Sequence, residues 1–212
     1  MTQRRLGRNR ELALEEREEI YAVLDQGVVA HIGFVDPDTH EPVVIPVAYA
    51  RDGDRLLFHG STGSRMFIAL KSGTPVCATV TILDGLVVAR SAFNSSMNYR
   101  SVMAFGIPRA IEGDAKAVAL QKVTEHLIPG LSEFARPSTT KEYAQTMVIE
   151  LILDDVTAKR RQGGSDDPED AGLPIWAGHL PVSMTMGAPI TNDDARHVAV
   201  PEFVQKLEGR VT

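Results

Sequence analysis

The chain has 212 residues, 43% of them apolar, which is enough to build one domain with a substantial core. Its net charge of −6 argues against nucleic-acid binding, which needs a dense positive field, and favours a small-molecule partner. The single cysteine, Cys77, excludes an internal disulfide and a thiolate metal cluster. The sequence shows no secretory signal and no apolar run long enough for a membrane span, so we expect a cytoplasmic protein that does not bind membranes.

The first third of the chain predicts a helix followed by an antiparallel meander. Apolar residues recur at helical spacing among many glutamates, and then short apolar runs alternate with turn signals such as Asp52-Gly53-Asp54. A short amphipathic helix interrupts the strands. The predicted helices span 11–24 and 64–73, and the predicted strands 28–35, 43–50 and 55–60.

The remainder predicts three further strands, a long helix and a final short one. Because the strands pair locally and the helices cover them instead of making regular crossovers, we predict a mainly β fold (β+α), a six-stranded antiparallel barrel with surrounding helices. The acidic, glycine-rich segment 163–172 is typical of a mobile loop. The later strands are predicted at 75–93, 97–112 and 146–161, and the helices at 115–128 and 200–208.

The stretch FHGSTGSRM, residues 58–66, combines two glycines and three hydroxyl residues with a cation at the predicted start of a helix. Its spacing fits neither a P-loop nor a Rossmann fingerprint. The free amides of a first helical turn bind anions, and an anion would explain Arg65, since a cation there opposes the helix dipole by up to about 1 kcal/mol. The alternative is a Ser or Thr N-cap beside a solvated arginine, and these residues alone leave both readings open.

Other chemically notable residues also have two interpretations. The six histidines lack the spacing of a zinc site, so no metal is expected. His59 ends a strand beside the 58–66 turn and is either functional or an ordinary strand histidine. The basic run Lys159-Arg160-Arg161 is a solvated strand end or a second phosphate clamp, and Trp176 is a packing residue or the cover of an aromatic ligand.

Several segments, taken together and in order, resemble the FMN-binding split-barrel proteins of the pyridoxamine 5′-phosphate oxidase superfamily. The branch they resemble is that of flavin-nucleotide-binding and nitroimidazole-resistance proteins. The resemblance covers about residues 15–182, so we expect a single domain over 1–212 with its core there and a C-terminal extension at 183–212. The segments are VVIPVAYARDGDRLLFHGSTGSRM, SAFNSSMNYRSVMAFGIPRAIE, TEHLIPG, KRRQG and LPIWAGHLP.

The resemblance implies a split-barrel homodimer that binds FMN in two clefts at the subunit interface. It places the flavin phosphate against Ser61, Ser64 and Arg65, where relatives often have lysine in place of Arg65. It also places His59, the candidate catalytic residue, and Gly60 near the flavin ring or ribityl chain. The other implied contacts are Ile45, Pro46 and Val47 along the isoalloxazine, Tyr99, Arg100 and Ser101 on a cleft strand, and Lys159, Arg161 and Trp176 reaching the partner's cofactor.

The function that this resemblance implies is an FMN-dependent oxidoreductase, similar to a nitroreductase, acting on a small, planar, electron-poor substrate. Pyridoxamine 5′-phosphate oxidation itself is disfavoured, because the RxHxR-type ending of the true oxidases is missing. Two alternatives stay open. One is a flavin carrier or sensor without turnover, and the other is a haem-binding relative that uses His31 or His59.

Overall fold

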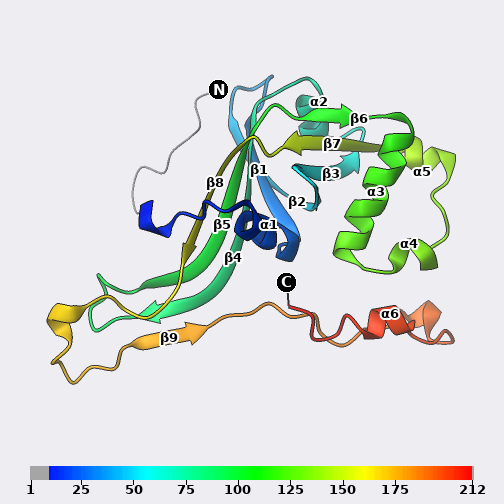
Figure 1. The fold of residues 1–212 in the computed structure, drawn as a ribbon. Helices are drawn as coiled ribbons and strands as arrows, with labels where there is room; N and C mark the ends of the chain where they lie inside the picture. The colour runs from blue at the N-terminus through cyan, green and yellow to red at the C-terminus, as the bar shows by residue number, and fades with distance from the viewer. Residues whose placement is uncertain (1–9, 212) are drawn as a thin grey trace.

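The structure is a computed structural model that describes residues 10–211, and antiparallel strands with short helices around them dominate it (Figure 1). The strands alternate buried and exposed side chains, as in the first, where Ala30 and Ile32 are buried and His31 is exposed. The strands are β1 (Val29–Val35), β2 (Pro42–Asp52), β3 (Arg55–Ser61), β4 (Val76–Val88), β5 (Ser96–Gly106), β6 (Arg109–Ile111), β7 (Thr146–Ile152), β8 (Asp155–Arg161) and β9 (Gly178–Pro181).

These strands form one curled antiparallel sheet in the order β6-β7-β3-β2-β1-β4-β5-β8, with β9 beside β4. The split-barrel class predicted from the sequence is confirmed, but residues 10–211 contain nine strands instead of six. Pro108 has no amide hydrogen for a ladder, and the predicted strand 97–112 breaks there into β5 and β6. The predicted strand 146–161 turns at Leu153 and Asp154, so that β7 joins β3 while β8 joins β5.

The helices lie around this sheet. The first α-helix begins at Arg17 and not at Glu11, because the preceding segment pairs with β8, where Leu14 N–H donates to the Ala158 carbonyl at 3.1 Å. The long helix near 115–128 is confirmed as α3, whereas α4 and α5 were missed. The helices are α1 (Arg17–Gln26), α2 (Arg65–Lys71), α3 (Gly113–Leu127), α4 (Leu131–Phe134), α5 (Thr140–Gln145) and α6 (Glu202–Gln205), with 3₁₀ turns at Arg10–Leu12, Pro168–Asp170 and Asp193–Ala195. No helix in residues 10–211 is long and apolar enough to cross a membrane.

Two apolar clusters lie on opposite faces of β3. The main core fills the inside of the curl and includes Leu56 and Phe58, whose neighbours in sequence point the other way. Leu57 belongs to a smaller cluster on the outer face, which α3 covers with Ala119 and Val123. The face inside the curl is called the inner face below, and the opposite one the outer face.

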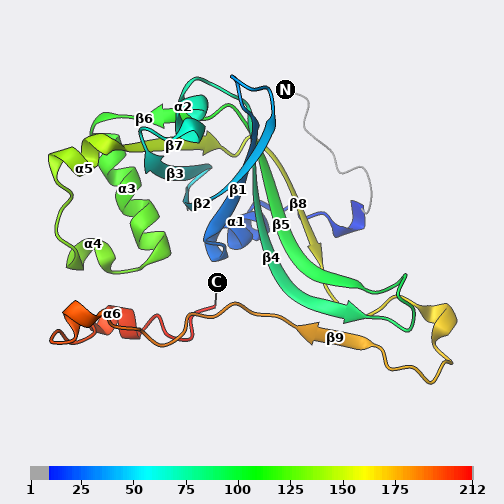
Figure 2. The same ribbon diagram turned by 180° about the vertical axis from the view of Figure 1, so that it is seen from behind.

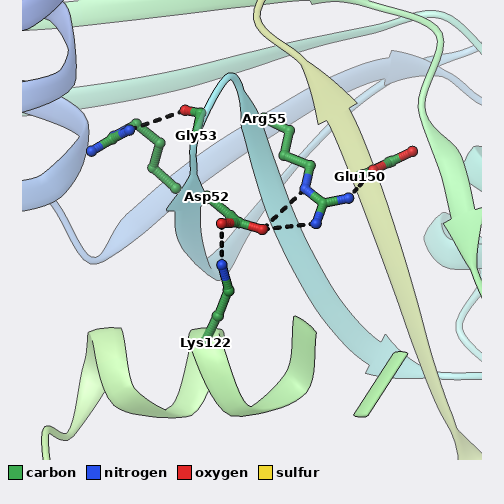
Figure 3. Close-up of polar contacts among 6 residues, drawn as sticks. Asp52, Gly53, Arg55, Lys122 and Glu150 are labelled. Carbon is green, nitrogen blue, oxygen red and sulfur yellow. Dashed lines mark hydrogen bonds and ion pairs between the residues drawn. The ribbon is translucent and has the colours of Figure 1, made fainter. Parts of the chain in front are cut away.

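Ion pairs fix the turn between β2 and β3 (Figure 3). Asp52 accepts hydrogen bonds from Lys122 of α3 and from Arg55, and Arg55 also donates to Glu150 of β7 at 2.7 Å. Asp52, Arg55 and Glu150 are partly buried while Lys122 is exposed, and together they connect α3, the turn and β7. The start of β3 is therefore tied to both of its neighbours.

The far ends of β4, β5 and β8 extend away from the curl as an arm, along which β9 lies (Figure 2). The segment 163–172, which lies between β8 and β9 and was predicted to be a mobile loop, is anchored to this arm. Asp167 is buried and accepts hydrogen bonds from the Arg90 amide at 2.7 Å and from the Ser165 hydroxyl at 2.9 Å. The C-terminal segment then returns to the helices, where Phe203 packs against Phe134 of α4.

Candidate functional site

Strands β2 and β3 separate part-way along their length. They pair only from Tyr49–Asp52 with Arg55–Phe58; before Tyr49, β2 pairs with β1, while β3 pairs with β7 as far as Ser61. Beyond Tyr49 and Phe58, the edges of β2 and β3 that face one another have no ladder pairing between them within residues 10–211. Unpaired strand edges offer backbone donors and acceptors to a ligand. We call this place the strand divergence.

The residues predicted to lie along a flavin ring are beside the strand divergence, but they do not share one face. Ile45 and Val47 pack against the main core, whereas Pro46 is exposed on the outer face opposite His31. Gly60 faces inward, and a Cβ there would lie 2.3 Å from the Phe67 ring of α2. A ligand at the divergence would therefore meet the Pro46 side chain and backbone edges, not a row of side chains.

The turn after β3 carries hydroxyl groups that the helix does not use. Ser64 occupies the N-cap position of α2, but its side chain makes no capping hydrogen bond. The Ser61 hydroxyl oxygen accepts only a 3.2 Å hydrogen bond from the Gly63 amide. The alternative of a conventional side-chain N-cap is therefore not what the structure shows, and both hydroxyls can serve a ligand.

Arg65 is tethered, not freely solvated. Its Nη2 donates to the Asp36 carboxylate at 2.8 Å; the Asp36 side chain is 8% exposed and that of Arg65 is 73% exposed. The pKa of Asp36 is lowered by the backbone amides of Thr39 and Asp38 and then by Arg65, so the carboxylate is a stable anionic partner. Arg65 makes no other hydrogen bond among the described residues, which leaves most of its donors available to an anion.

His59 is half-buried on the outer face, because it pairs with Val148 and lies two residues after Leu57, and both of these belong to the outer cluster. Its Nδ1 atom is buried without a hydrogen-bond partner. Burial lowers the pKa of His59, so the ring is neutral at physiological pH. A neutral imidazole there acts as a hydrogen-bonding group or a metal ligand, and not as a fixed positive charge.

The predicted residues of β5 and β8 are not brought to the strand divergence within one chain. Strand β5 lies three strand spacings from β2, about 14 Å. Tyr99 and Ser101 alternate with Arg100, which turns to the opposite face and binds Asp84 with two hydrogen bonds of 2.9 and 2.7 Å. Opposite them on β8, Lys159 pairs with Ser101 in register, and Arg161 pairs with Tyr99 and donates to Asn98.

Trp176 lies on the arm, just before β9, with its side chain 65% exposed. A Cβ on Gly178 would lie 2.7 Å from its indole ring, so the glycine is what lets the ring rest against the backbone. Strand β9 pairs with the far end of β4, remote in the sheet from the turn after β3. Trp176 is thus presented to the outside of the chain and not to its own strand divergence.

The family model of the pyridoxamine 5′-phosphate oxidases matches residues 16–160, which include the strand divergence, the turn and most of β8. The chain belongs to this family. Its fold is that of the FMN-binding split-barrel superfamily. No curated protein sequence matches the chain.

Solved structures of this superfamily resemble the chain over most of its length. The FAD and haem binding protein from Mycobacterium smegmatis is 39% identical, with a TM-score of 0.89 over 93% of this chain and 98% of that one. The flavocytochrome Anf3 from Azotobacter vinelandii is 37% identical, with a TM-score of 0.89 over 97% and 96%. A candidate 5-nitroimidazole antibiotic resistance protein from Bacteroides thetaiotaomicron is 21% identical, with a TM-score of 0.59 over 69% and 85%, and shares the fold alone.

Sequence reasoning missed two residues of this candidate site. Asp36 holds Arg65 across 29 positions, and the turn-rich PDTHEP segment gave no sign of it. Phe67 of α2 packs against Gly60, and the sequence indicated only that it belongs to a short amphipathic helix. The amphipathic pattern of 64–73 could have indicated that Phe67 points back at β3, but not which residue it meets.

Proposed function

We propose that this protein is a flavin-binding redox protein that holds the flavin nucleotide at the strand divergence. The observation that carries this proposal is a set of polar groups around one short segment that the chain leaves available to a ligand. They are the unpaired edges of β2 and β3, the Ser64 hydroxyl, which makes no capping hydrogen bond, and the exposed guanidinium of Arg65. A flavin nucleotide has a planar ring rich in hydrogen-bonding atoms, and its ribityl chain ends in a phosphate. Family membership supports the same assignment.

In this proposal Arg65, Ser61 and Ser64 bind the phosphate next to the ribityl chain. Arginine and hydroxyl donors suit phosphate oxygens, and Asp36 limits the orientations that the Arg65 side chain can take. Helix α2 has only 7 residues, so we assign the phosphate to these side chains and not to the helix dipole. Pro46 and the backbone edges of β2 and β3 lie where the ring would be oriented.

The sequence suggested FMN, but the M. smegmatis protein with 39% identity binds FAD, which contains FMN joined to AMP. Both nucleotides carry the phosphate that Arg65 would bind. We therefore propose a flavin nucleotide, with FAD ahead of FMN. When bound, the flavin supplies the hydride or electron chemistry, and the protein supplies binding and orientation.

We further propose that the protein is a homodimer with the flavin between subunits. Valines on the outer face of β1 and β2 are exposed, by 43% at Val29 and 65% at Val44, and such patches commonly mark interfaces. A second copy would bring Tyr99, Ser101 and Lys159 near a strand divergence that they cannot reach within their own chain. Light scattering of the purified protein tests this: we expect a dimer, a monomeric Val44→Glu variant, and much weaker flavin binding by that monomer.

We propose that the protein is an oxidoreductase that reduces a small, planar, electron-poor substrate. Titrating the purified apoprotein with FAD, FMN and riboflavin by flavin fluorescence is the first test, and NADH or NADPH under anaerobic conditions is the second. Binding of FAD or FMN in the micromolar range or tighter supports the proposal, and failure of all three flavins to bind rejects it. Bound flavin that neither nicotinamide nucleotide reduces would reject a nicotinamide-linked reaction and favour a carrier or sensor.

A second candidate function is electron transfer between flavin and haem. One of the two whole-chain relatives binds FAD and haem, and the other is a flavocytochrome. In this chain, the buried and unpartnered nitrogen of His59 is the observation that favours it. Haem needs a protein ligand, and His59 on the outer face offers a neutral imidazole for that role.

A further inference from the structure

The two faces of the arm differ in what covers them. On the inner face, Val87 and Asn98 are buried, and the segment after β8 is bound there, since Asn98 Nδ2 donates to the Gly163 carbonyl at 2.9 Å. The outer face of the same strands carries five apolar side chains that are each 38–65% exposed to solvent. One face of the arm is therefore packed by the chain itself, and the other is left to solvent.

The strand register places these exposed side chains next to one another. Leu86 of β4 pairs with Met97 of β5 on one side and with Leu180 of β9 on the other, so the three form one row across the arm. Leu83 lies on the same face one row nearer the curl, where it pairs with Tyr99. The arm thus presents a contiguous apolar surface and not scattered single residues.

Trp176 extends this surface. Gly178 lies two residues before Leu180 and therefore on the same face of β9. The Trp176 indole rests against that face, since it lies 2.7 Å from where a Cβ on Gly178 would be. We call the whole surface the arm patch, and its members are Leu83, Leu86, Met97, Trp176 and Leu180.

The arm patch is continuous with a second apolar surface on the outer face of the curl. Toward the curl, the outer face of β4 continues from Leu83 through Thr81 and Thr79, and Thr79 pairs with His31 of β1. Beyond this polar strip, β1 and β2 carry the exposed residues of what we call the valine patch, Val29, Val35 and Val44. Two apolar patches therefore lie on one outer face, with polar side chains between them.

A second copy of the chain is the occupant that suits this arrangement. Stable dimers bury about 800 Å² of each copy, which is more than the largest apolar patch of a typical monomer, at about 300–600 Å². Neither patch covers such an area alone, but one continuous outer face that includes both does. A lipid surface fits less well, because the segment on the opposite face of the arm carries the exposed acids Asp166 and Glu169, which anionic headgroups repel.

We propose that the arm patch of each copy docks on the valine patch of the other. A two-fold axis crossing the polar strip makes this contact twice and covers both apolar patches in both copies. Packing of arm on arm would instead leave the two valine patches in water. This inference rests on the homodimer proposed above and deepens it, because it names the arm as the surface that each copy contributes.

The test measures the dimer dissociation constant of the full-length protein by analytical ultracentrifugation, with and without added FAD. The variants are Leu86→Glu, in the middle of the arm patch, and the matched control Ile190→Glu, since Ile190 is 96% exposed but lies in the C-terminal segment. We expect a dimeric wild type, a dissociation constant at least about 10-fold higher for Leu86→Glu, and a change within about 3-fold for Ile190→Glu. Circular dichroism checks folding, and Leu180→Glu replaces Leu86→Glu if the latter is unfolded.

A charge pair tests which surfaces meet. Val44→Lys alone should also weaken the dimer, and Val44→Lys combined with Leu86→Glu in one chain should recover at least part of the loss, because each lysine then lies near a glutamate of the other copy. A loss in Leu86→Glu without recovery in the double variant would overturn the docking of arm patch on valine patch.

The remaining outcomes separate this inference from the homodimer itself. A Leu86→Glu protein that dimerises like the wild type, while Val44→Glu is monomeric, rejects the role of the arm and leaves the proposed homodimer intact. Equal losses in Leu86→Glu and Ile190→Glu would also overturn the assignment to the arm patch. A monomeric wild type rejects both proposals, and binding of that monomer to phosphatidylcholine vesicles would assign the arm patch to lipid.

Discussion

The two ends of strand β3 differ in how far their polar groups are satisfied by the chain itself. At the Arg55 end, Asp52 and Glu150 are both paired, and Lys122 joins the same network. At the Ser61 end, the Ser64 hydroxyl caps nothing and Arg65 has one partner. The polar groups at the Arg55 end bind one another, and we call it the closed end. The Ser61 end keeps hydrogen-bond donors that can bind a ligand, and we call it the open end.

The largest effect is expected from removing the cation at the open end. We expect Arg65→Ala to weaken FMN and FAD binding about 10- to 100-fold, since charge-assisted hydrogen bonds contribute about 1.5–3 kcal/mol. Riboflavin has no phosphate and should bind about equally to both proteins. Fluorescence titration measures all three, with Lys71→Ala as the control because Lys71 is an exposed cation at the other end of α2. Equal losses for FMN and riboflavin would remove Arg65 from the phosphate site.

A large effect on stability is expected at Gly60, where the Phe67 ring packs against β3 on the inner face. A Cβ at Gly60 meets the Phe67 ring at 2.3 Å, and we expect Gly60→Ala to lower the free energy of unfolding by about 1–3 kcal/mol. In Gly63→Ala the nearest atom is 3.7 Å away, so that variant is the control. Urea denaturation measures both. Combining Gly60→Ala with Phe67→Leu should recover part of the loss, and strict additivity would contradict the contact.

A smaller, pH-dependent effect is expected at the closed end. The hydrogen bond from Lys122, and then that from Arg55, lowers the pKa of Asp52. A lowered folded-state pKa stabilises the protein above the unfolded value near 4, and this contribution is lost as the pH falls. We expect Asp52→Asn to cost about 1 kcal/mol at pH 7 and the gap to the wild type to shrink below about pH 4.

Thermal unfolding across pH 3–7 measures this gap. The control is Asp154→Asn, since Asp154 is exposed and makes no ion pair among the described residues. A gap for Asp52→Asn that stays constant down to pH 3 would show that the carboxylate charge contributes nothing at this end.

The smallest effect is expected at Ser64, and it separates binding from folding. Because Ser64 makes no capping bond, Ser64→Ala should change the free energy of unfolding by less than about 0.5 kcal/mol, while FMN affinity falls a few-fold for one lost hydrogen bond. Thr139 heads a complete capping box with Glu142 on α5, so Thr139→Ala should cost about 1 kcal/mol without affecting FMN. Equal stability losses in both variants would contradict the comparison.

Much of the fold was readable from local patterns. The alternation in β1 to β3, the Asp52-Gly53-Asp54 turn and the helical period of α3 all correspond to observed elements. The errors lie where tertiary contacts override local signals. The segment before Arg17 carries a helical pattern but pairs with β8, and β9 is a strand because the end of β4 offers it an edge.

By itself, the sequence determined the strand-turn-helix around 58–66, the antiparallel class and the types of residue that could bind a flavin phosphate. These follow from side-chain periodicity and turn chemistry, which act over a few residues. Only the tertiary structure decided that β2 and β3 are unpaired before Tyr49 and beyond Phe58, that Asp36 holds Arg65, and that His59 takes the outer face and Gly60 the inner face. Those facts depend on strand register and on contacts between distant residues, and a one-residue slip in register would exchange the two faces of β3.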